Sequence, residues 1–443
     1  MNSQTFCRAV IAFLVLIPIG VSAQQDTTDA LIKRMEIQVK LSPTDYKAFA
    51  GLGAAYLQKG RETGDASDFE LAKKTLAKSL DLVSNDPAAA YAMTQMAVVC
   101  MSEHRFGDAY AWAQKAIAQG SGDPSPWAIA GDALADMGRY QEAEAAYSRL
   151  TNSYGSEDEQ LGLAYQRDSR MSYLKLVAGD STTAIQLMQA AIRTAAEIHA
   201  PAENVAWSDY QLGEEYFQTG DLDRAEAAYR ASLHEYSGYY RALAGLAKIE
   251  AAKRNYREAE SLYEGAIAAV PYPEYAAALG DIYVASHETA KAQKEFKLVE
   301  FIGHLSEINR EIHNRDLALF YADHDIRLSE AVALARKELE VRRDVYTWDV
   351  LAWTLYKNGE TSEAAPAMSH ALEQGTKDPQ LLFHAGMIYG RLRDVTKARQ
   401  FLTEALATNP NFHPLHADMA RKTLAELANE KEPQVIQEAN NAK

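Results

Sequence analysis

The 443-residue sequence has only two cysteines, Cys7 and Cys100, and no pair of them at metal-ligand spacing. It also lacks a Gly-rich phosphate loop, a Gly-x-Ser-x-Gly elbow and a His-Glu-x-x-His pair. Acidic residues outnumber basic ones, 61 against 45, and the net charge of −16 disfavours a nucleic-acid partner. These absences argue against the common catalytic sites, so we expect no enzyme activity and no cofactor.

A long apolar run occurs only at the start of the chain. Arg8 precedes apolar residues 9–19, and the small residues of 21–23 suit cleavage. This pattern is typical of a secretory signal peptide, residues 1–23. The run is short for a bilayer span, so an uncleaved anchor is the alternative. We expect an exported protein, periplasmic or secreted, in which Cys100 is a small buried hydrophobe and nothing inserts into a membrane after cleavage.

The rest of the chain is organised around residues 209–233, DYQLGEEYFQTGDLDRAEAAYRASL. A first helix carries Gly213 in its apolar face and ends at a turn at Gly220. In the second helix Ala225 and Tyr229 lie four residues apart, which is a helical spacing. Gly213 and Ala225 are small enough to let the two helices cross closely. Neither helix can bury its apolar face alone, so the hairpin needs neighbours on both sides.

The same order of residues recurs about every 34 positions. The small residue of the first helix recurs at Gly53, Gly131, Ala247, Gly280, Ala352 and Gly386. Weaker copies at 93–117, 171–192 and 317–339 bring the number to about ten. With this order and period, the chain resembles the tetratricopeptide repeat (TPR) proteins. The resemblance implies an all-α fold, an α-α superhelix or solenoid of about ten repeats with a C-terminal capping helix.

The last third has a further resemblance. Residues 318–325 (ALFYADHD), 356–359 (YKNG), 384–388 (HAGMI) and 411–415 (NFHPL) are similar to a recurring C-terminal block of exported bacterial TPR proteins of unassigned activity. This resemblance implies a location in the bacterial envelope and names no partner.

The pattern divides the chain into segments. We expect a signal peptide at 1–23, an N-terminal lead-in at 24–44, an N-terminal array at 45–290, long connecting helices at 291–316, a C-terminal array at 317–413, a capping helix at 414–428 and a disordered tail at 429–443. A bend near Gly303 would hinge the two arrays. One continuous superhelix is the alternative.

The family resemblance implies that the first helix of each pair lines a concave groove, which binds a protein or peptide. The groove positions that we select are aromatic or acidic. They are Trp207, Tyr210, Glu214, Phe217, Asp132, Asp136, Tyr346, Asp349, Trp353 and Tyr356. Exposed rings with a few charges suit recognition of an extended chain. The competing interpretation is that rings at such positions pack against neighbouring helices.

Histidines near the C-terminus provide the alternative function, a periplasmic metal-binding or metal-delivery protein. His413 and His416 are three residues apart, and His324 lies in an earlier turn, with His384 between them in the sequence. Imidazoles on one helical face could bind zinc or nickel. Pro414 lies between His413 and His416 and interrupts a helix there. The competing explanation is therefore that these histidines are polar turn and capping residues. The partner and the oligomeric state remain open.

Overall fold

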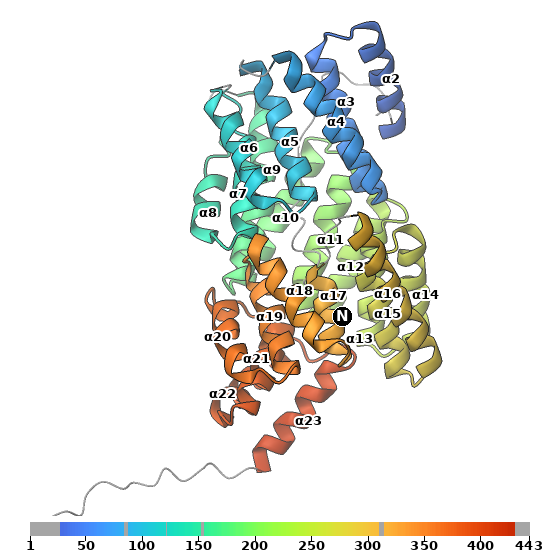
Figure 1. Ribbon diagram of the computed structural model, residues 1–443, viewed down its shortest axis with the longest axis vertical. Coiled ribbons are helices and arrows are strands. Elements are labelled where there is room, and N and C mark those ends of the chain that lie inside the picture. Colours follow the sequence, from blue (N-terminus) through green and yellow to red (C-terminus); the bar gives the residue numbers. More distant parts are fainter. Residues whose placement is uncertain (1–26, 84–86, 121, 152–154, 310–313, 430–443) are drawn as a thin grey trace, which may run out of the picture.

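The structure is a computed structural model that describes residues 27–83, 87–120, 122–151, 155–309 and 314–429 (Figure 1). Within these ranges it contains twenty-two α-helices, one short 3₁₀ helix and no strand, which confirms the all-α class. The predicted signal peptide lies outside the described residues, as does the predicted tail beyond Asn429. None of the described helices is both long and apolar enough to cross a membrane.

Consecutive helices pack in pairs, which confirms a solenoid of ten hairpins, here numbered repeats 1 to 10. In order they are α3 (Tyr46–Thr63) with α4 (Ala66–Val83), α5 (Ala90–Ser102) with α6 (Phe106–Ala118), α7 (Pro126–Asp136) with α8 (Tyr140–Tyr147), α9 (Glu157–Val177) with α10 (Ser181–Glu197), α11 (Ala202–Gln218) with α12 (Leu222–Glu235), α13 (Tyr240–Ala252) with α14 (Tyr256–Ala269), α15 (Pro273–Ala285) with α16 (Thr289–Asn309), α17 (Asn314–Asp323) with α18 (Leu328–Val341), α19 (Val345–Lys357) with α20 (Thr361–Leu372), and α21 (Pro379–Arg391) with α22 (Val395–Thr408).

Single helices flank the ten hairpins. Helix α2 (Thr28–Leu41) occupies the expected lead-in and packs on α3. Helix α23 (His416–Asn429) packs on α22 and matches the expected cap. Leu427 is buried on its inward face, whereas Met419 is 41% exposed.

The two helices of a hairpin cross at a small residue. Gly213 lies seven residues before Gly220, which ends the turn with a φ of 79°. A Cβ atom on Gly213 would lie 2.5 Å from a ring carbon of Tyr229, so only glycine fits under that ring. The crossing predicted at Gly213 is confirmed, and Ala225 is fully buried on the facing helix.

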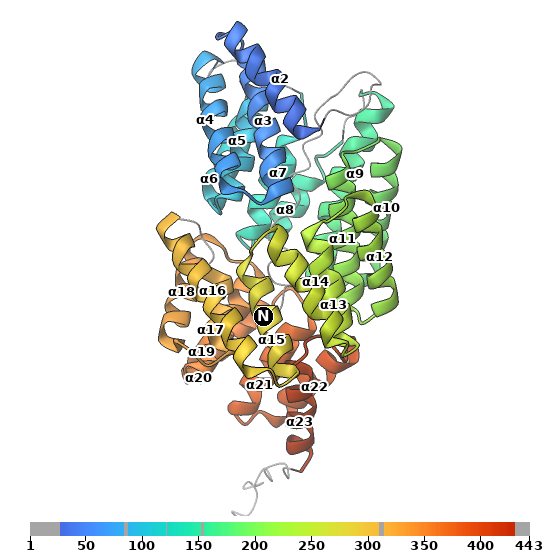
Figure 2. The same cartoon turned by 90° about the vertical axis from the view of Figure 1, so that its right-hand side faces the viewer.

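The first helices form an inner layer and the second helices an outer layer. In α11, sixteen of seventeen residues are buried, whereas α12 buries only four of fourteen. In Figure 2 the outer helices α10 and α12 lie at one edge and α18 and α20 at the other. The amphipathic second helices therefore shield the first helices from solvent on the outside.

The superhelix winds so tightly that its successive turns touch. The backbone N–H of Arg343 donates to the carbonyl oxygen of Asp136 at 2.9 Å, and the side-chain amide of Asn409 donates to the carbonyl of Phe217 at 2.6 Å. In both cases the turn between the two helices of one repeat contacts a segment that follows a later repeat. The two repeats are five apart in the array. Gly179, in the turn of repeat 4, contacts Gly375, which follows repeat 9, so these repeats are also five apart. We call these the inter-turn contacts. They place repeats 8 to 10 against repeats 3 to 5 (Figure 1).

In the described part of the region expected to hold two long connecting helices, residues 291–309 and 314–316, there is one long helix. Helix α16 is the second helix of repeat 7 and runs without interruption from Thr289 to Asn309, through Gly303. The next described helix, α17, is short and begins repeat 8. A Cβ on Gly303 would lie 2.9 Å from a methyl carbon of Leu317, so this glycine allows α16 and α17 to approach closely. The expectation of two long helices was wrong, because the extra apolar positions extend a single repeat helix.

Candidate functional site

The residues predicted to line an open groove are on the first helices, but they are not exposed. Trp207, Tyr210, Glu214 and Phe217 follow one face of α11 and are between 2% and 6% exposed. The other predicted residues on α7 and α19 are Asp132, Asp136, Tyr346, Asp349, Trp353 and Tyr356; all are buried except Tyr356, which is half-buried. The prediction that these side chains are accessible in this state was therefore wrong.

Three of the acidic residues are buried because each pairs with a side chain one repeat further along. The pairs are Asp132 with Arg170, Glu214 with Lys248 and Asp349 with His384, at 2.8, 2.6 and 2.9 Å. We call these pairs the inter-repeat ladder. A buried carboxylate needs such a partner, because desolvation of an unpaired charge is costly. The ladder holds neighbouring first helices in register.

The sequence contains a signal for this ladder that we did not use. Glu214 and Lys248 each follow the small residue of their hairpin, and they are separated by 34 positions, which is one repeat. Opposite charges at the same register of neighbouring repeats therefore indicate an internal pair. Burial raises the pKa of Asp132 to about 6, although the Arg170 guanidinium opposes the shift.

The inner face of repeats 5 to 7 has polar groups that the ladder does not use. Trp207 on α11, Arg241 on α13 and Glu274 on α15 occupy the same register, six residues before the small crossing residue. Trp207 Nε1 and both carboxylate oxygens of Glu274 are buried and make no hydrogen bond within the described part of the chain. Burial, with a contribution from Asp316, raises the pKa of Glu274 well above its ordinary value. Buried polar atoms of this kind usually bind water or a ligand.

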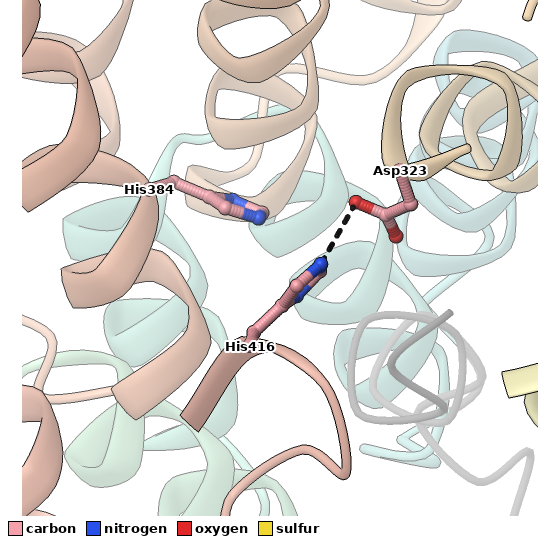
Figure 3. Close-up of side chains that lie close together, drawn as sticks. All are labelled: Asp323, His384 and His416. Carbon is pink, nitrogen blue, oxygen red and sulfur yellow. Dashed lines mark ion pairs between the residues drawn. The ribbon is translucent and has the colours of Figure 1, made fainter. Parts of the chain in front are cut away.

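The C-terminal histidines also come together, although not in the predicted combination. The rings of His413 and His416 stack with centroids 4.2 Å apart. His324 and His413 both approach Asp281, at 3.4 and 3.3 Å. However, the group whose ligand atoms lie within 4.8 Å of one another is Asp323, His384 and His416 (Figure 3).

The surroundings of His324, His413 and His416 favour the uncharged form of each ring. Burial lowers the pKa of His416 well below its ordinary value, and the neighbouring His413 and His384 rings lower it further. Burial likewise lowers the pKa of His413 and of His324. A neutral imidazole has a free lone pair and can act as a hydrogen-bond acceptor or a metal ligand. His384 belongs to this cluster because α21 and α23 pack together, which spacing along the chain does not reveal.

Ten stacked helical hairpins with an internal ladder define the class of α-helical repeat proteins. A family model described as "Tetratricopeptide repeat" matches residues 210–274 and 350–411, and one described as "Tetratricopeptide repeat-like domain" matches residues 19–169. The chain belongs to the tetratricopeptide repeat family. Such repeats commonly mediate protein–protein interaction, and membership is typical of non-enzymatic scaffold proteins.

Three solved structures illustrate the likeness of this chain to known proteins. Yeast Tom70 is 14% identical, with 90% of this chain and 92% of that chain covered and a TM-score of 0.36. The APC/C hetero-tetramer Cut9–Hcn1 is 12% identical, with 90% and 93% covered and a TM-score of 0.34. A tetratricopeptide repeat protein from Parabacteroides merdae is 17% identical, with 60% and 99% covered and a TM-score of 0.34. A comparison with curated proteins found no match. At these TM-scores the likeness supports no functional argument.

Proposed function

We propose that this chain is a non-catalytic scaffold of the bacterial envelope that binds a protein or peptide. Family membership supports the interaction role. The apolar run at residues 9–19 and the C-terminal sequence block support export and an envelope location. The repeats are folded before a partner arrives, so binding requires little ordering of the scaffold.

The partner binds on the inner face of repeats 5 to 7. One observation carries this part of the proposal: Trp207 Nε1 and the Glu274 carboxyl oxygens are buried without hydrogen-bond partners in the part of the chain that is described. Each unsatisfied group destabilises a protein by about 1–3 kcal/mol. An extended peptide backbone offers the acceptor that an indole N–H needs and the donor that a carboxyl oxygen needs.

Access to this face requires movement, because Trp207 is only 6% exposed and Glu274 only 1%. The inter-turn contacts hold successive turns of the superhelix together. We infer that the partner enters when these turns separate. Binding should therefore be slower than docking on an open groove, since the required conformation is a minor one.

The test compares two tryptophans in a pull-down from envelope extract. Trp207→Phe removes the indole N–H but keeps most of the ring volume, whereas alanine would leave a cavity costing about 3–5 kcal/mol. Trp348→Phe is the matched control, because Trp348 lies on α19 away from this face, half-buried against the ring of His370.

We expect proteins that are retained by the wild-type chain and by Trp348→Phe to be lost with Trp207→Phe. Glu274→Gln should weaken the same capture, because it alters the second unpartnered group. Equal capture by all variants would show that the partner does not bind on this face. If the wild-type chain retained no protein at all, the scaffold role would be contradicted as well.

A further inference from the structure

We propose that Asp323, His384 and His416 form a binding site for one divalent transition-metal ion such as Zn²⁺, Co²⁺ or Ni²⁺. The three side chains come from α17, α21 and α23 and point toward one another (Figure 3). One ligand atom from each lies within 4.8 Å of the other two. This proposal does not depend on the partner-binding role.

His384 is oriented as a metal ligand. Its Nδ1 lies 2.9 and 3.1 Å from the two carboxylate oxygens of Asp349, which leaves Nε2 as the ligand atom. The ring is completely buried and stacks on Trp353 at a centroid distance of 4.2 Å. A carboxylate behind a ligating imidazole is the usual outer partner in zinc sites, because it fixes the ring and raises its basicity.

The orientation of the His416 ring is also fixed by its neighbours. Its Nδ1 lies 2.6 Å from the Gln380 amide nitrogen, and its Nε2 lies 3.8 Å from Asp323 Oδ1. The ring stacks on His413 and on Phe383, with centroid distances of 4.2 and 4.9 Å. Nε2 is therefore the atom that faces the carboxylate. Because the Gln380 amide donates to Nδ1, Nε2 carries the proton of the neutral ring, and an ion would displace that proton.

Asp323 supplies the independent observation that points to a ligand. Its Oδ1 accepts a hydrogen bond from Trp353 Nε1 at 2.8 Å, but its Oδ2 is buried and has no partner among the described residues. An uncompensated carboxylate oxygen inside a protein is costly, and a bound cation would satisfy it.

The Gln380 side chain is the group that must move. Its amide nitrogen lies 2.9 Å from His384 Nε2, where the ion would bind, and its own Oε1 is buried and has no hydrogen-bond partner within the described ranges. Rotation of the amide would release His384, let Oε1 accept from the Nδ1–H of a metal-bound His416, and turn Oε1 toward the ion. The resulting set of two imidazole nitrogens with carboxylate and amide oxygens suits zinc, cobalt or nickel, whereas Ca²⁺ and Mg²⁺ prefer oxygen ligands alone.

The ion would link the cap helix α23 to the repeats. Asp323 belongs to repeat 8, His384 to repeat 10 and His416 to the cap helix, so one ion would link three helices that are separate in sequence. The competing explanation is a hydrogen-bonded histidine and aspartate network that needs no ion.

The experiment titrates the metal-stripped full chain with Co²⁺, followed by visible absorption, and with Zn²⁺ by competition with a chromophoric chelator. We expect one ion per chain with a Kd below about 10 μM, since ligated sites of this kind are tight. Asp323→Asn and His384→Gln should each weaken binding at least tenfold. Asp323→Asn keeps the acceptor for Trp353, and circular dichroism would verify that both variants fold.

Two histidines outside the site serve as controls. His324→Gln changes a partly buried imidazole that follows Asp323 in the sequence and faces Asp281, and His370→Gln changes an exposed one. Both should bind like the wild type. Binding no tighter than about millimolar, or binding that Asp323→Asn leaves unchanged, would overturn the proposal in favour of the plain network. Equal weakening by His324→Gln would show that the ion binds elsewhere in the cluster.

Discussion

The substitution Gly138→Ala, which adds one methyl group, tests whether the inter-turn contacts stabilise the protein. Gly138 forms the turn between α7 and α8 with a φ of 74°, and a Cβ there would overlap the carbonyl oxygen of Arg343 in the next turn of the superhelix. Gly359 forms the equivalent turn between α19 and α20 with a φ of 87°, but no atom of the described chain beyond its neighbours lies within 4 Å of its Cβ position. The two glycines share a conformation and differ in their surroundings, so Gly359→Ala is a control for Gly138→Ala.

The expected magnitudes follow from this geometry. Alanine in the left-handed conformation costs about 1 kcal/mol at either position. At Gly138 the overlap with Arg343 adds about 1–3 kcal/mol. The same displacement strains two hydrogen bonds of 2.9 Å, from Arg343 N–H to the Asp136 carbonyl and from Val345 N–H to the Tyr140 hydroxyl, worth about 1 kcal/mol each. We therefore expect a loss of about 3–5 kcal/mol for Gly138→Ala and about 1 kcal/mol for Gly359→Ala.

The assay is urea denaturation followed by far-UV circular dichroism, together with small-angle X-ray scattering of the folded variants. Gly138→Ala should unfold at a clearly lower urea concentration than Gly359→Ala. It should also have a larger radius of gyration, because repeats 8 and 9 no longer rest against repeat 3. Equal unfolding midpoints and equal radii for the two variants would refute the idea that contacts between turns stabilise this superhelix.

Three further predictions follow from buried groups. Lys248→Met leaves Glu214 buried without its cation and should cost about 3–5 kcal/mol in denaturation, whereas adding Glu214→Gln should restore much of that loss. Burial, reinforced by Glu235, raises the pKa of Asp209 to about 7, so the folded state binds this proton more tightly than the unfolded state does. Stability should fall as pH rises from about 4 to about 7, and Asp209→Asn should have a flatter profile of melting temperature against pH. Burial raises the pKa of the Cys100 thiol to about 11, so its reaction with a thiol reagent should be slow until urea unfolds the chain; fast reaction in buffer would contradict the burial.

Much of the fold could be predicted from the sequence because a repeat hairpin is a local object. Its period, its glycine turn and its small crossing residue lie within one stretch of chain, as at Gly213 and Gly220. The wrong prediction of two helices in residues 291–316 also had a local cause. An apolar pattern at helical spacing indicates helix, but it does not show whether the residues form one helix or two. The continuous helix α16 was decided by its packing against α15.

The candidate sites were harder to predict, since exposure is not a local property. Glu214 and Trp207 look like groove residues on an isolated helix. They are buried because the next repeat presents Lys248 and because the surrounding helices enclose α11. Likewise, the cluster of Asp323, His384 and His416 joins residues from three helices. Of these, His416 was a candidate ligand in the sequence, whereas His384 was noted only as a histidine between His324 and His413, and Asp323 was not a candidate.

The sequence by itself determined the hairpin, its repetition and the class of protein, because spacing of small and apolar residues sets how two adjacent helices cross. Only the tertiary structure decided how far each hairpin rotates against the next. That small rotation, summed over five repeats, brings Gly138 against Arg343 and encloses the inner face. No single stretch of residues determines this total rotation, because it accumulates over many interfaces between repeats. The accessibility of every inner side chain depends on it.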